Sequence, residues 1–525
     1  TMIRFADLLM LLALLIPLMG ATPAGAETKS WDGGAGTNSW QHDGNWLPNG
    51  EPETWDDVTI DGNHRVFLSG TTDVIRTLDL TNGAQLFANG YQLMVATLDG
   101  AGVTSITGED SYLTVQPGDF YWDFYTDTLN LTGGPGSGLN IDGGIVKVIK
   151  DVVVDNDATV WSHQDYGHPK LICWGTLSLG GNSLLDVHDA LTLDAEGKGE
   201  FDLDGADADS EIRVNSDSHL VVNGPIVDDF DGLLIVQDGG SARFEEPWTV
   251  GGTSVGGTVR LRPGPYPEDA SVLEGAACTL EGTLDLFQGI GRIDAPVTFG
   301  GTSTIAMGDE VALIDPHLVL NDQTTYLGPS FAQYGYGETM VIQNGEAVVN
   351  ASTTIPVNTY DWDGEDGTTA TSVAPYQTLT LAVDAIEQDT GMVIDGYNGT
   401  CSLLSGHLDV QTPSSWRMMG TLRLINTVGT APSVSGSKMI VGFGVSTGAV
   451  EVTGGPADLN CDVSFTDRAD VQIAAGAELR VHGDTTFAGG QYAGEGMLTL
   501  DSTAEVVAQT TLECSLCLDA SAELT

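Results

Sequence analysis

One aromatic segment has the composition of a sugar-binding platform. Between Asp119 and Asp127 it holds five aromatic residues in six positions: Phe120, Tyr121, Trp122, Phe124 and Tyr125. Because alternate side chains of a strand point to opposite faces, at least two of these rings should be exposed or lie in a loop. Aromatic rings cover the apolar faces of sugars, and carboxylates accept hydrogen bonds from hydroxyl groups. We therefore predict that Phe120, Tyr121, Trp122 and Tyr125 contact a glycan; the alternative is a loop that packs its own rings against the protein.

A second segment is rich in carboxylates. Residues 194–209 contain seven acidic residues and one lysine. Within it, Asp202, Asp204, Asp207 and Asp209 alternate with small or apolar residues, so that several of them can face one loop. Oxygen-rich loops suit Ca²⁺, and structural calcium is the one cofactor that the sequence suggests. The alternative is a solvated acidic face.

The sequence assigns no catalytic residue. A polysaccharide lyase needs a base near the sugar proton that it removes, and Arg260 and Arg262 form the densest basic spot. If Leu261 is a core residue of a strand, both arginines face outward, as solvated arginines usually do. A glycoside hydrolase needs two carboxylates at a defined separation, and the chain offers too many pairs to choose from. These features favour a non-enzymatic role over that of a lyase or hydrolase.

The net charge excludes two classes of partner. The chain has 18 Lys and Arg residues against 73 Asp and Glu residues, which gives a formal charge of −55. Such an acidic surface repels phosphates and anionic lipids. We expect neither nucleic-acid binding nor membrane insertion of the mature chain.

The N-terminus has the pattern of an export signal. An apolar run at 8–16 follows Arg4, and Ala24-Gly25-Ala26 is a small-x-small cleavage site. The run is too short to span a bilayer comfortably. We predict a signal peptide at 1–26 and a protein that is secreted or displayed on the surface of a bacterium.

The cysteines do not form a disulfide framework. Four stand singly among apolar residues and are expected to be small buried hydrophobes: Cys173, Cys278, Cys401 and Cys461. Cys514 and Cys517 form a C-x-x-C pair with no histidine or second pair beside it, which predicts a local disulfide rather than a zinc or redox site.

Short alternating segments occupy most of the chain. Apolar residues recur in pairs with one residue between them: Leu78/Leu80, Leu93/Val95, Leu191/Leu193, Leu284/Leu286 and Val471/Ile473. This two-residue period predicts strands with one buried face. Frequent Asn-Gly and Asp-Gly pairs at the ends of the segments indicate tight corners. The chain is therefore expected to be all-β.

Repetition indicates the architecture. The tetrad Thr-Leu-x-Leu occurs at 77–80, 128–131, 176–179, 283–286, 378–381 and 421–424. Its spacing fits multiples of a unit of roughly 20–27 residues, which is typical of solenoids whose coils stack around one core. We predict a right-handed parallel β-helix. Tandem antiparallel β-sandwiches joined by hairpins are the alternative.

A tryptophan-rich block precedes the first strands. Trp31, Trp40, Trp46 and Trp55 lie among Gly, Asn, Asp and Pro residues. We predict that residues 27–57 form a cap over the open end of the core, and that 58–525 form coils with loops leaving the stack near 263–267 and 360–370. The last residues still have the pattern of a coil, so we expect no polar cap there, which would allow end-to-end self-association.

The start of the mature chain resembles a known family. It follows the pattern Trp31-x-x-Gly34…Trp40…Asn45-Trp46…Asp56-Asp57-Val58-x-Ile60. This is similar to the N-terminal signature of secreted bacterial β-helix repeat proteins of the pectin-lyase-like and autotransporter-like kinds. The resemblance implies a parallel β-helix, export and surface residence, in a family that ranges from polysaccharide lyases to adhesins. The Gly-His-Gly signature of β-helical pectin hydrolases is missing, since Pro169 and Leu408 stand at its third position.

Together these features predict an exported β-solenoid with a structural, adhesive or glycan-contacting role. Its expected partner is an extracellular polysaccharide or a neighbouring surface protein. Two alternatives remain: an extracellular polysaccharide lyase or glycoside hydrolase on the same scaffold, and a passenger fragment of a longer adhesin or autotransporter.

Overall fold

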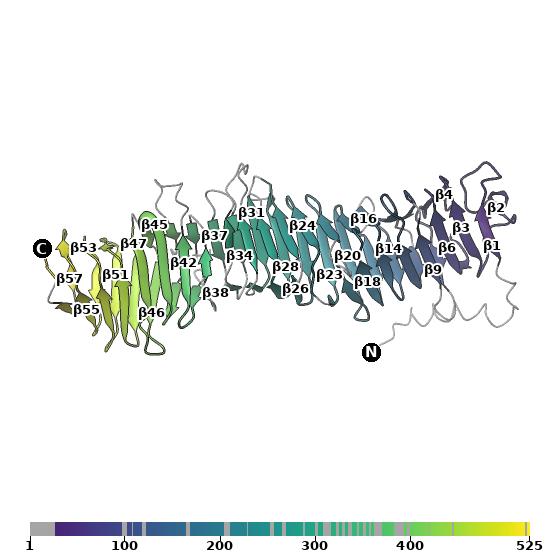
Figure 1. Ribbon diagram of the computed structural model, residues 1–525. Coiled ribbons are helices and arrows are strands. Elements are labelled where there is room, and N and C mark those ends of the chain that lie inside the picture. The colour runs from purple at the N-terminus through teal and green to yellow at the C-terminus, as the bar shows by residue number, and fades with distance from the viewer. Residues whose placement is uncertain are drawn as a thin grey trace. The chain divides into compact units, whose positions relative to one another are not determined.

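The protein is a parallel β-solenoid. In the computed structural model 57% of the residues are in strands and 1% in helix, and the sheets stack as about 14 turns (Figure 1). The predicted all-β solenoid is confirmed. Tandem antiparallel sandwiches are wrong, because strands of successive coils pair in parallel. Among the described strands, β1 (Thr28–Trp31) pairs antiparallel with β2 (Trp46–Leu47).

The structure describes residues 27–525 apart from the following gaps: 97–101, 108, 118–121, 164–167, 204–209, 228, 252–256, 265–268, 287–288, 300–302, 308–316, 322–324, 328–330, 334–338, 344–345, 350–352, 356–358, 362–369, 383–392, 396–399, 419, 444–445 and 520–521. The predicted signal peptide and most of the two predicted loops therefore lie outside the described residues. In the part of the chain that is described, no helix has the length and apolar character that a membrane span requires.

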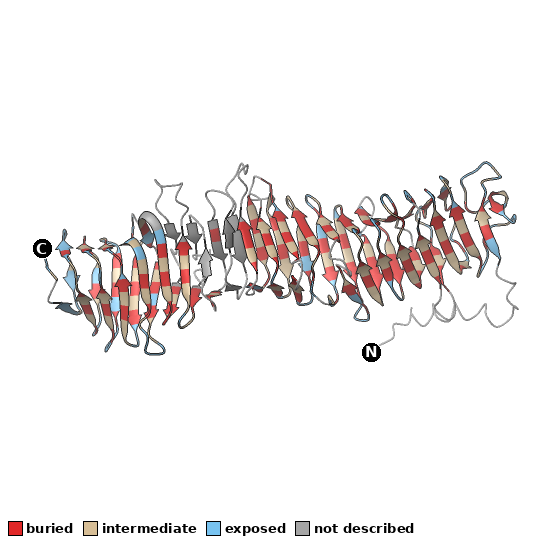
Figure 2. Ribbon diagram, in the orientation of Figure 1, coloured by how far each residue is buried: buried red, intermediate tan, exposed pale blue. Residues whose placement is uncertain are grey.

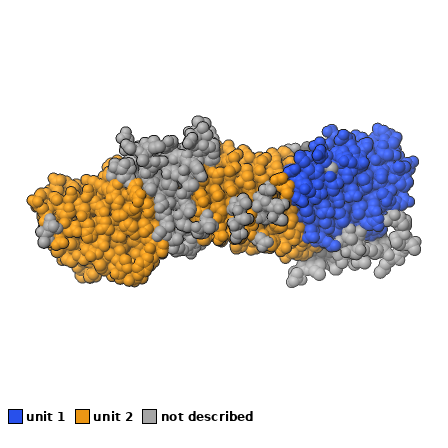
Figure 3. Space-filling model, viewed as in Figure 1, with its two compact units in different colours: residues 1–159, 165–167 blue, residues 160–164, 168–525 orange. Residues whose placement is uncertain are grey.

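The chain divides into two compact units, residues 1–159 with 165–167 and residues 160–164 with 168–525 (Figure 3). We call a series of strands that pair in parallel, one per coil, a ladder. Unit 1 contains three ladders. Ladder 1 is β1, β3 (Asp57–Asp61), β6 (Thr77–Thr81), β9 (Val103–Ile106), β12 (Thr128–Leu131) and β15 (Val152–Val154). Ladder 2 is β4 (Arg65–Phe67), β7 (Gln85–Phe87), β10 (Tyr112–Val115) and β13 (Gly138–Asp142). Ladder 3 is β5 (Val74–Ile75), β8 (Leu93–Val95), β11 (Phe124–Thr126) and β14 (Ile145–Val148). A 3₁₀ turn, η2 (Asp43–Asn45), precedes β2.

Unit 2 contains five ladders. Ladder 4 is β18 (Thr176–Leu179) and β21 (Glu200–Asp202). Ladder 5 is β16 (Thr159–His163), β19 (Leu184–Val187), β22 (Glu211–Val214), β24 (Leu233–Gln237), β27 (Thr258–Arg262), β30 (Thr283–Leu286), β33 (Thr304–Met307) and β36 (Phe331–Gln333). Ladder 6 is β26 (Trp248–Val250), β29 (Cys278–Leu280), β32 (Val297–Phe299), β35 (Thr325–Leu327), β38 (Glu346–Val349), β41 (Ala370–Val373), β44 (Thr400–Leu404), β46 (Gly420–Ile425), β48 (Gly448–Thr453), β51 (Ala469–Ile473), β54 (Gln491–Ala493) and β57 (Thr511–Leu512).

The last two ladders share two long strands, β45 (His407–Met418) and β47 (Ser433–Val441). Ladder 7 is β17 (Lys170–Cys173), β20 (Ala190–Asp194), β23 (His219–Asn223), β25 (Ser241–Phe244), β28 (Ser271–Gly275), β31 (Ile290–Asp294), β34 (His317–Asn321), β37 (Thr339–Gln343), β40 (Thr359–Asp361), β43 (Val393–Asp395), β45, β47, β50 (Val463–Phe465), β53 (Thr485–Phe487) and β56 (Ala504–Val506). Ladder 8 is β39 (Thr353–Ile355), β42 (Thr378–Ala382), β45, β47, β49 (Pro456–Asn460), β52 (Glu478–Val481), β55 (Met497–Leu500) and β58 (Ser515–Leu518).

The alternation in the sequence produces this core. Leu78 and Leu80 of β6 are fully buried while Asp79 between them is half-buried, and the same red and tan alternation runs through both units (Figure 2). Along ladder 1, Asp57 pairs with Thr77 and Thr77 with Val103, so that successive coils are 20 and 26 residues long. These lengths agree with the predicted unit.

Three of the four N-terminal tryptophans pack together in unit 1. The Trp46 ring lies edge-on to Trp31, with centroids 5.0 Å apart, and edge-on to Trp40, with centroids 4.8 Å apart. Trp31, Trp40 and Trp46 are buried, whereas Trp55 is half-buried with φ +74°. The three rings lie in the segment that begins with β1, which pairs with β3, and the cap at residues 27–57 stays a prediction.

The six cysteines are all free thiols. Cys173, Cys278, Cys401 and Cys461 are buried, as predicted, and burial raises the pKa of Cys278, Cys401 and Cys461 to about 12. Cys514 is half-buried and Cys517 is exposed, and the local disulfide expected between them is not formed.

Candidate functional site

The predicted aromatic platform lies on the outer face of ladder 3 in unit 1. Phe124 points into the core and is fully buried, while Tyr125 points outward from β11 and is half-buried. Trp122 precedes the strand, and its ring centroid lies 5.6 Å from that of Tyr125 at an interplanar angle of 41°. Phe120 and Tyr121 lie outside the described residues. The structure thus brings together two of the four predicted residues.

A buried lysine completes this cluster, which we call the Trp122 cluster: Trp122, Tyr125 and Lys147. Lys147 on β14 pairs with Tyr125 on β11, and its Nζ atom lies 4.7 Å from the centroid of the Trp122 ring. Only 2% of Lys147 is exposed. Burial, followed by the charge of Asp127, raises the pKa of Tyr125 to about 12. The protonated hydroxyl group can donate a hydrogen bond, as that of any tyrosine does at neutral pH. The cluster presents an aromatic ring and a hydroxyl donor, and the ammonium group of the buried Lys147 lies over the indole ring.

The neighbouring carboxylates have structural roles. Asp123 accepts a 2.8 Å hydrogen bond from the Ile145 amide, and Asp127 accepts one of 2.8 Å from the Gly102 amide. Both carboxylates are at most 3% exposed. They connect coils to one another and are not placed on the surface where a sugar hydroxyl would reach them.

Lys147 is a member of this cluster that the sequence did not predict. It stands in Val146-Lys147-Val148, 22 residues after Tyr125, which is one coil length. A search for polar residues one coil away from the aromatic segment would have found it, provided that the length of that particular coil was known.

The predicted calcium loop is only partly described. Asp202 lies at the end of β21 and accepts a 2.9 Å hydrogen bond from the Ser178 hydroxyl group. Asp204, Asp207 and Asp209 lie outside the described residues. Within the described ranges, no group of three or more His, Cys, Asp or Glu side chains is arranged to hold a metal ion.

At least half of the basic side chains form ion pairs with carboxylates. At least nine of the 18 Lys and Arg residues form ion pairs with carboxylates: Lys29, Arg76, Lys170, Arg213, Arg243, Arg260, Arg292, Arg423 and Arg480. The lyase candidate Arg260 faces outward, as expected beside the buried Leu261, and its Nε atom lies 2.7 Å from Asp285. An ion pair of this kind offsets the positive charge that an anionic substrate would need.

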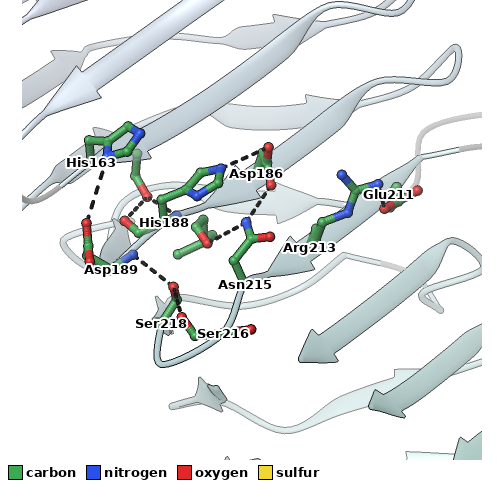
Figure 4. A network of polar contacts seen from close by, with 11 residues as sticks. His163, Asp186, His188, Asp189, Glu211, Arg213, Asn215, Ser216 and Ser218 are labelled. Carbon is green, nitrogen blue, oxygen red and sulfur yellow. Dashed lines mark hydrogen bonds and ion pairs between the residues drawn. The ribbon is translucent and has the colours of Figure 1, made fainter. Parts of the chain in front are cut away.

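A polar network in unit 2 contains two histidines (Figure 4). The His163 and His188 rings are stacked, with centroids 5.0 Å apart and an interplanar angle of 5°. His188 lies 3.2 Å from Asp186, and Asn215 donates a 2.7 Å hydrogen bond to the other oxygen of Asp186. Because the lone pairs of imidazole lie in the ring plane, two stacked rings do not direct them at one ion. The network joins successive coils rather than forming a metal centre.

A third cluster places a histidine between two carboxylates on ladder 8. His482 Nε2 lies 3.1 Å from Asp458, and Nδ1 lies 2.5 Å from Asp501. Arg480 also donates a 2.9 Å hydrogen bond to Asp458. Burial lowers the pKa of His482, but the bonds to Asp458 and Asp501 outweigh burial and raise its pKa above the usual imidazole value.

The raised pKa of His482 predicts that the stability of unit 2 depends on pH. A histidine whose pKa is raised on folding stabilises the protein below the unfolded pKa of about 6.5, and the contribution is lost as pH rises through the folded pKa. We expect His482→Gln to lower the free energy of unfolding at pH 5.5 by less than about 1 kcal/mol, because His482 and its two carboxylate partners are partly exposed. The loss should appear as a lower melting temperature at that pH. At pH 9 the variant should melt like the wild type. An equal difference at both pH values would show that His482 stabilises the coil by packing alone.

No family model, curated protein or solved structure matches this chain. The fold and the three clusters are therefore the basis for any functional conclusion.

Proposed function

We propose that this protein is an exported extracellular or cell-surface β-solenoid that contacts uncharged glycans without cleaving them. We further propose that it belongs with the secreted β-helix repeat proteins that its tryptophan pattern resembles, in a structural or adhesive role. The Trp122 cluster carries the proposal, because an indole ring and a hydroxyl donor lie together on the outer face of a rigid coil.

The geometry of the cluster supports an uncharged ligand. Lys147 occupies one face of the Trp122 ring, so that a sugar would cover the other face and accept a hydrogen bond from Tyr125. The acidic surface and the many paired cations oppose a polyanionic chain such as polyuronate. Hydroxyl groups need no counter-charge, and the site offers them stacking and hydrogen bonds.

The test is retention of the purified chain on immobilised polysaccharides. Wild-type protein is expected to bind at least one neutral plant, algal or microbial glycan, and Trp122→Ala and Tyr125→Ala should each weaken binding about tenfold. Trp174→Ala is the matched control, because Trp174 is also half-buried with a lysine, Lys198, 3.1 Å from its ring centroid. Unchanged binding by Trp122→Ala would contradict this site.

A polysaccharide-cleaving enzyme is the second candidate. Asp458 and Asp501 lie two coils apart on either side of His482, and their contacts with the two ring nitrogens place their carboxylate oxygens at most about 8 Å apart, within the spacing of an inverting carboxylate pair. His482 occupies the space between them, where the sugar and water would have to enter. This candidate therefore ranks second. Release of reducing or unsaturated ends from a bound glycan would establish cleavage, and loss of that release in Asp458→Asn would assign it to this pair.

A further inference from the structure

Tyr376 has an unusual backbone and an unusual exposure. Of the large apolar side chains that the structure describes, it is the most exposed, at 69%. Its φ is +63°, in the left-handed region that costs a residue with a side chain free energy. Most other non-glycine residues with positive φ here are Asn or Asp, which tolerate this conformation. A solvated tyrosine held at such a position points to a function for the ring rather than for the fold.

The corner that holds Tyr376 lies beside a polar stripe. The Tyr376 amide donates a 3.2 Å hydrogen bond to the Ser405 carbonyl one coil further on, and the His407 amide donates one of 2.9 Å to the carbonyl of Gln377. Tyr376 thus stands two residues before Thr378, the first residue of β42, which pairs with His407, the first residue of β45. Tyr376 and the first residues of β45 therefore lie on neighbouring coils of ladder 8; β42 and β45 are labelled in Figure 1.

Hydrogen-bonding side chains lie on this face in two successive coils, on β45 and β47. His407 Nδ1 lies 2.8 Å from the Ser433 hydroxyl group, and Nε2 lies 3.0 Å from that of Ser435. Ser435 donates a 2.5 Å hydrogen bond to Asp409. All four side chains are half-buried, so that each retains a solvated side. Ser435 donates its hydroxyl proton to Asp409, so its Oγ atom can accept from the Nε2–H tautomer of His407, and a second lone pair can accept from a ligand hydroxyl group. The other Asp409 oxygen accepts a 2.6 Å hydrogen bond from Gln411.

We propose that Tyr376, His407, Ser433, Ser435 and Asp409 form a saccharide-binding site in unit 2, separate from the Trp122 cluster. Its ligand is a linear, uncharged, hydroxyl-rich polysaccharide. The exposed ring stacks on one sugar, and the hydroxyl, imidazole and carboxylate groups bond to the hydroxyls of the next sugars along ladder 8. Strands spaced by about 4.8 Å present these groups at a repeat close to that of a pyranose chain.

The variant Tyr376→Gly tests the role of the ring in binding without destabilising the fold. Glycine adopts positive φ without steric cost, so that this variant removes the ring and leaves the corner unstrained. We expect its melting temperature to equal or exceed that of the wild type. Its affinity for soluble β-glucan, xylan or galactomannan, measured by titration calorimetry on the full chain, should fall about tenfold for the polysaccharide that binds. Tyr376→Phe should keep most of the affinity, and Ser433→Ala should lose severalfold.

Leu47→Ala is the control, since Leu47 is also exposed, at 62%, and belongs to β2 of unit 1 and to neither proposed site. It should bind like the wild type. Unchanged affinity in Tyr376→Gly, or no binding of any of the three polysaccharides by the wild type, would overturn the site. If Trp122→Ala lost binding and Tyr376→Gly bound like the wild type, the proposed function would stand and this second site would be removed. Loss in Tyr376→Gly alone would establish the site in unit 2.

Discussion

Replacing Trp46 by alanine is expected to lower the melting temperature of unit 1 by roughly 10 °C. Trp46 is fully buried between the edges of two other indoles, and its Nε1 donates a 2.8 Å hydrogen bond to the carbonyl of Trp40. Truncation of a buried tryptophan costs about 3–5 kcal/mol, because it leaves a cavity that the surroundings fill only partly. The unpaired Trp40 carbonyl adds to this cost. Thermal unfolding followed by tryptophan fluorescence measures the effect.

Trp55→Ala is the control for this prediction. Trp55 belongs to the same segment but is half-buried, so its truncation should cost about 1 kcal/mol or less. If Trp46→Ala melted within a few degrees of the wild type, the packed indoles would not be a stabilising cap. The tryptophan segment would then become a candidate for ligand binding.

Replacing Gly436 by alanine is expected to destabilise unit 2 by about 3 kcal/mol or more. Gly436 lies on β47 opposite Val410 of β45, with φ +122°. A Cβ atom at this position would stand 2.0 Å from the Val410 carbonyl oxygen, which is backbone of the preceding coil and cannot rotate away. The two long strands would have to separate where ladders 7 and 8 share them. Urea denaturation of the variant measures the loss.

Gly429→Ala provides a matched comparison for this position. Gly429 also has positive φ, +82°, but an added Cβ atom would meet no atom within 4 Å. The substitution introduces only the left-handed strain, which costs about 1–2 kcal/mol. Equal destabilisation by the two substitutions would show that backbone strain, and not the close approach of neighbouring coils, limits Gly436.

Much of the fold could be predicted because solenoids repeat their local rules. The apolar pair Leu78 and Leu80 both point inward, as the two-residue period required, and a coil of 20–26 residues lies within the predicted unit. Leu261 is buried between two outward-facing arginines for the same reason. A period of two residues decides which face a side chain occupies before any tertiary contact forms.

The tetrad Thr-Leu-x-Leu shows where this reasoning ends. Every occurrence coincides with a strand, including β6, β30 and β46, but these strands belong to ladders 1, 5 and 6. The motif therefore reports the start of a strand and not a fixed position around the coil. A threonine at the start of a strand and two inward-pointing leucines fit a strand in any of the ladders equally well.

The sequence by itself determined the alternation, the coil length and the aromatic composition of the Trp122 cluster. Only the tertiary structure decided that Lys147 lies over Trp122, and that His407 lies between Ser433 and Ser435. The physical reason is register. Coils differ in length by several residues because their corners differ, and a slip of one residue would turn every side chain of a strand to the opposite face. Neighbours across coils are therefore fixed by the packing of whole coils, which local periodicity does not encode.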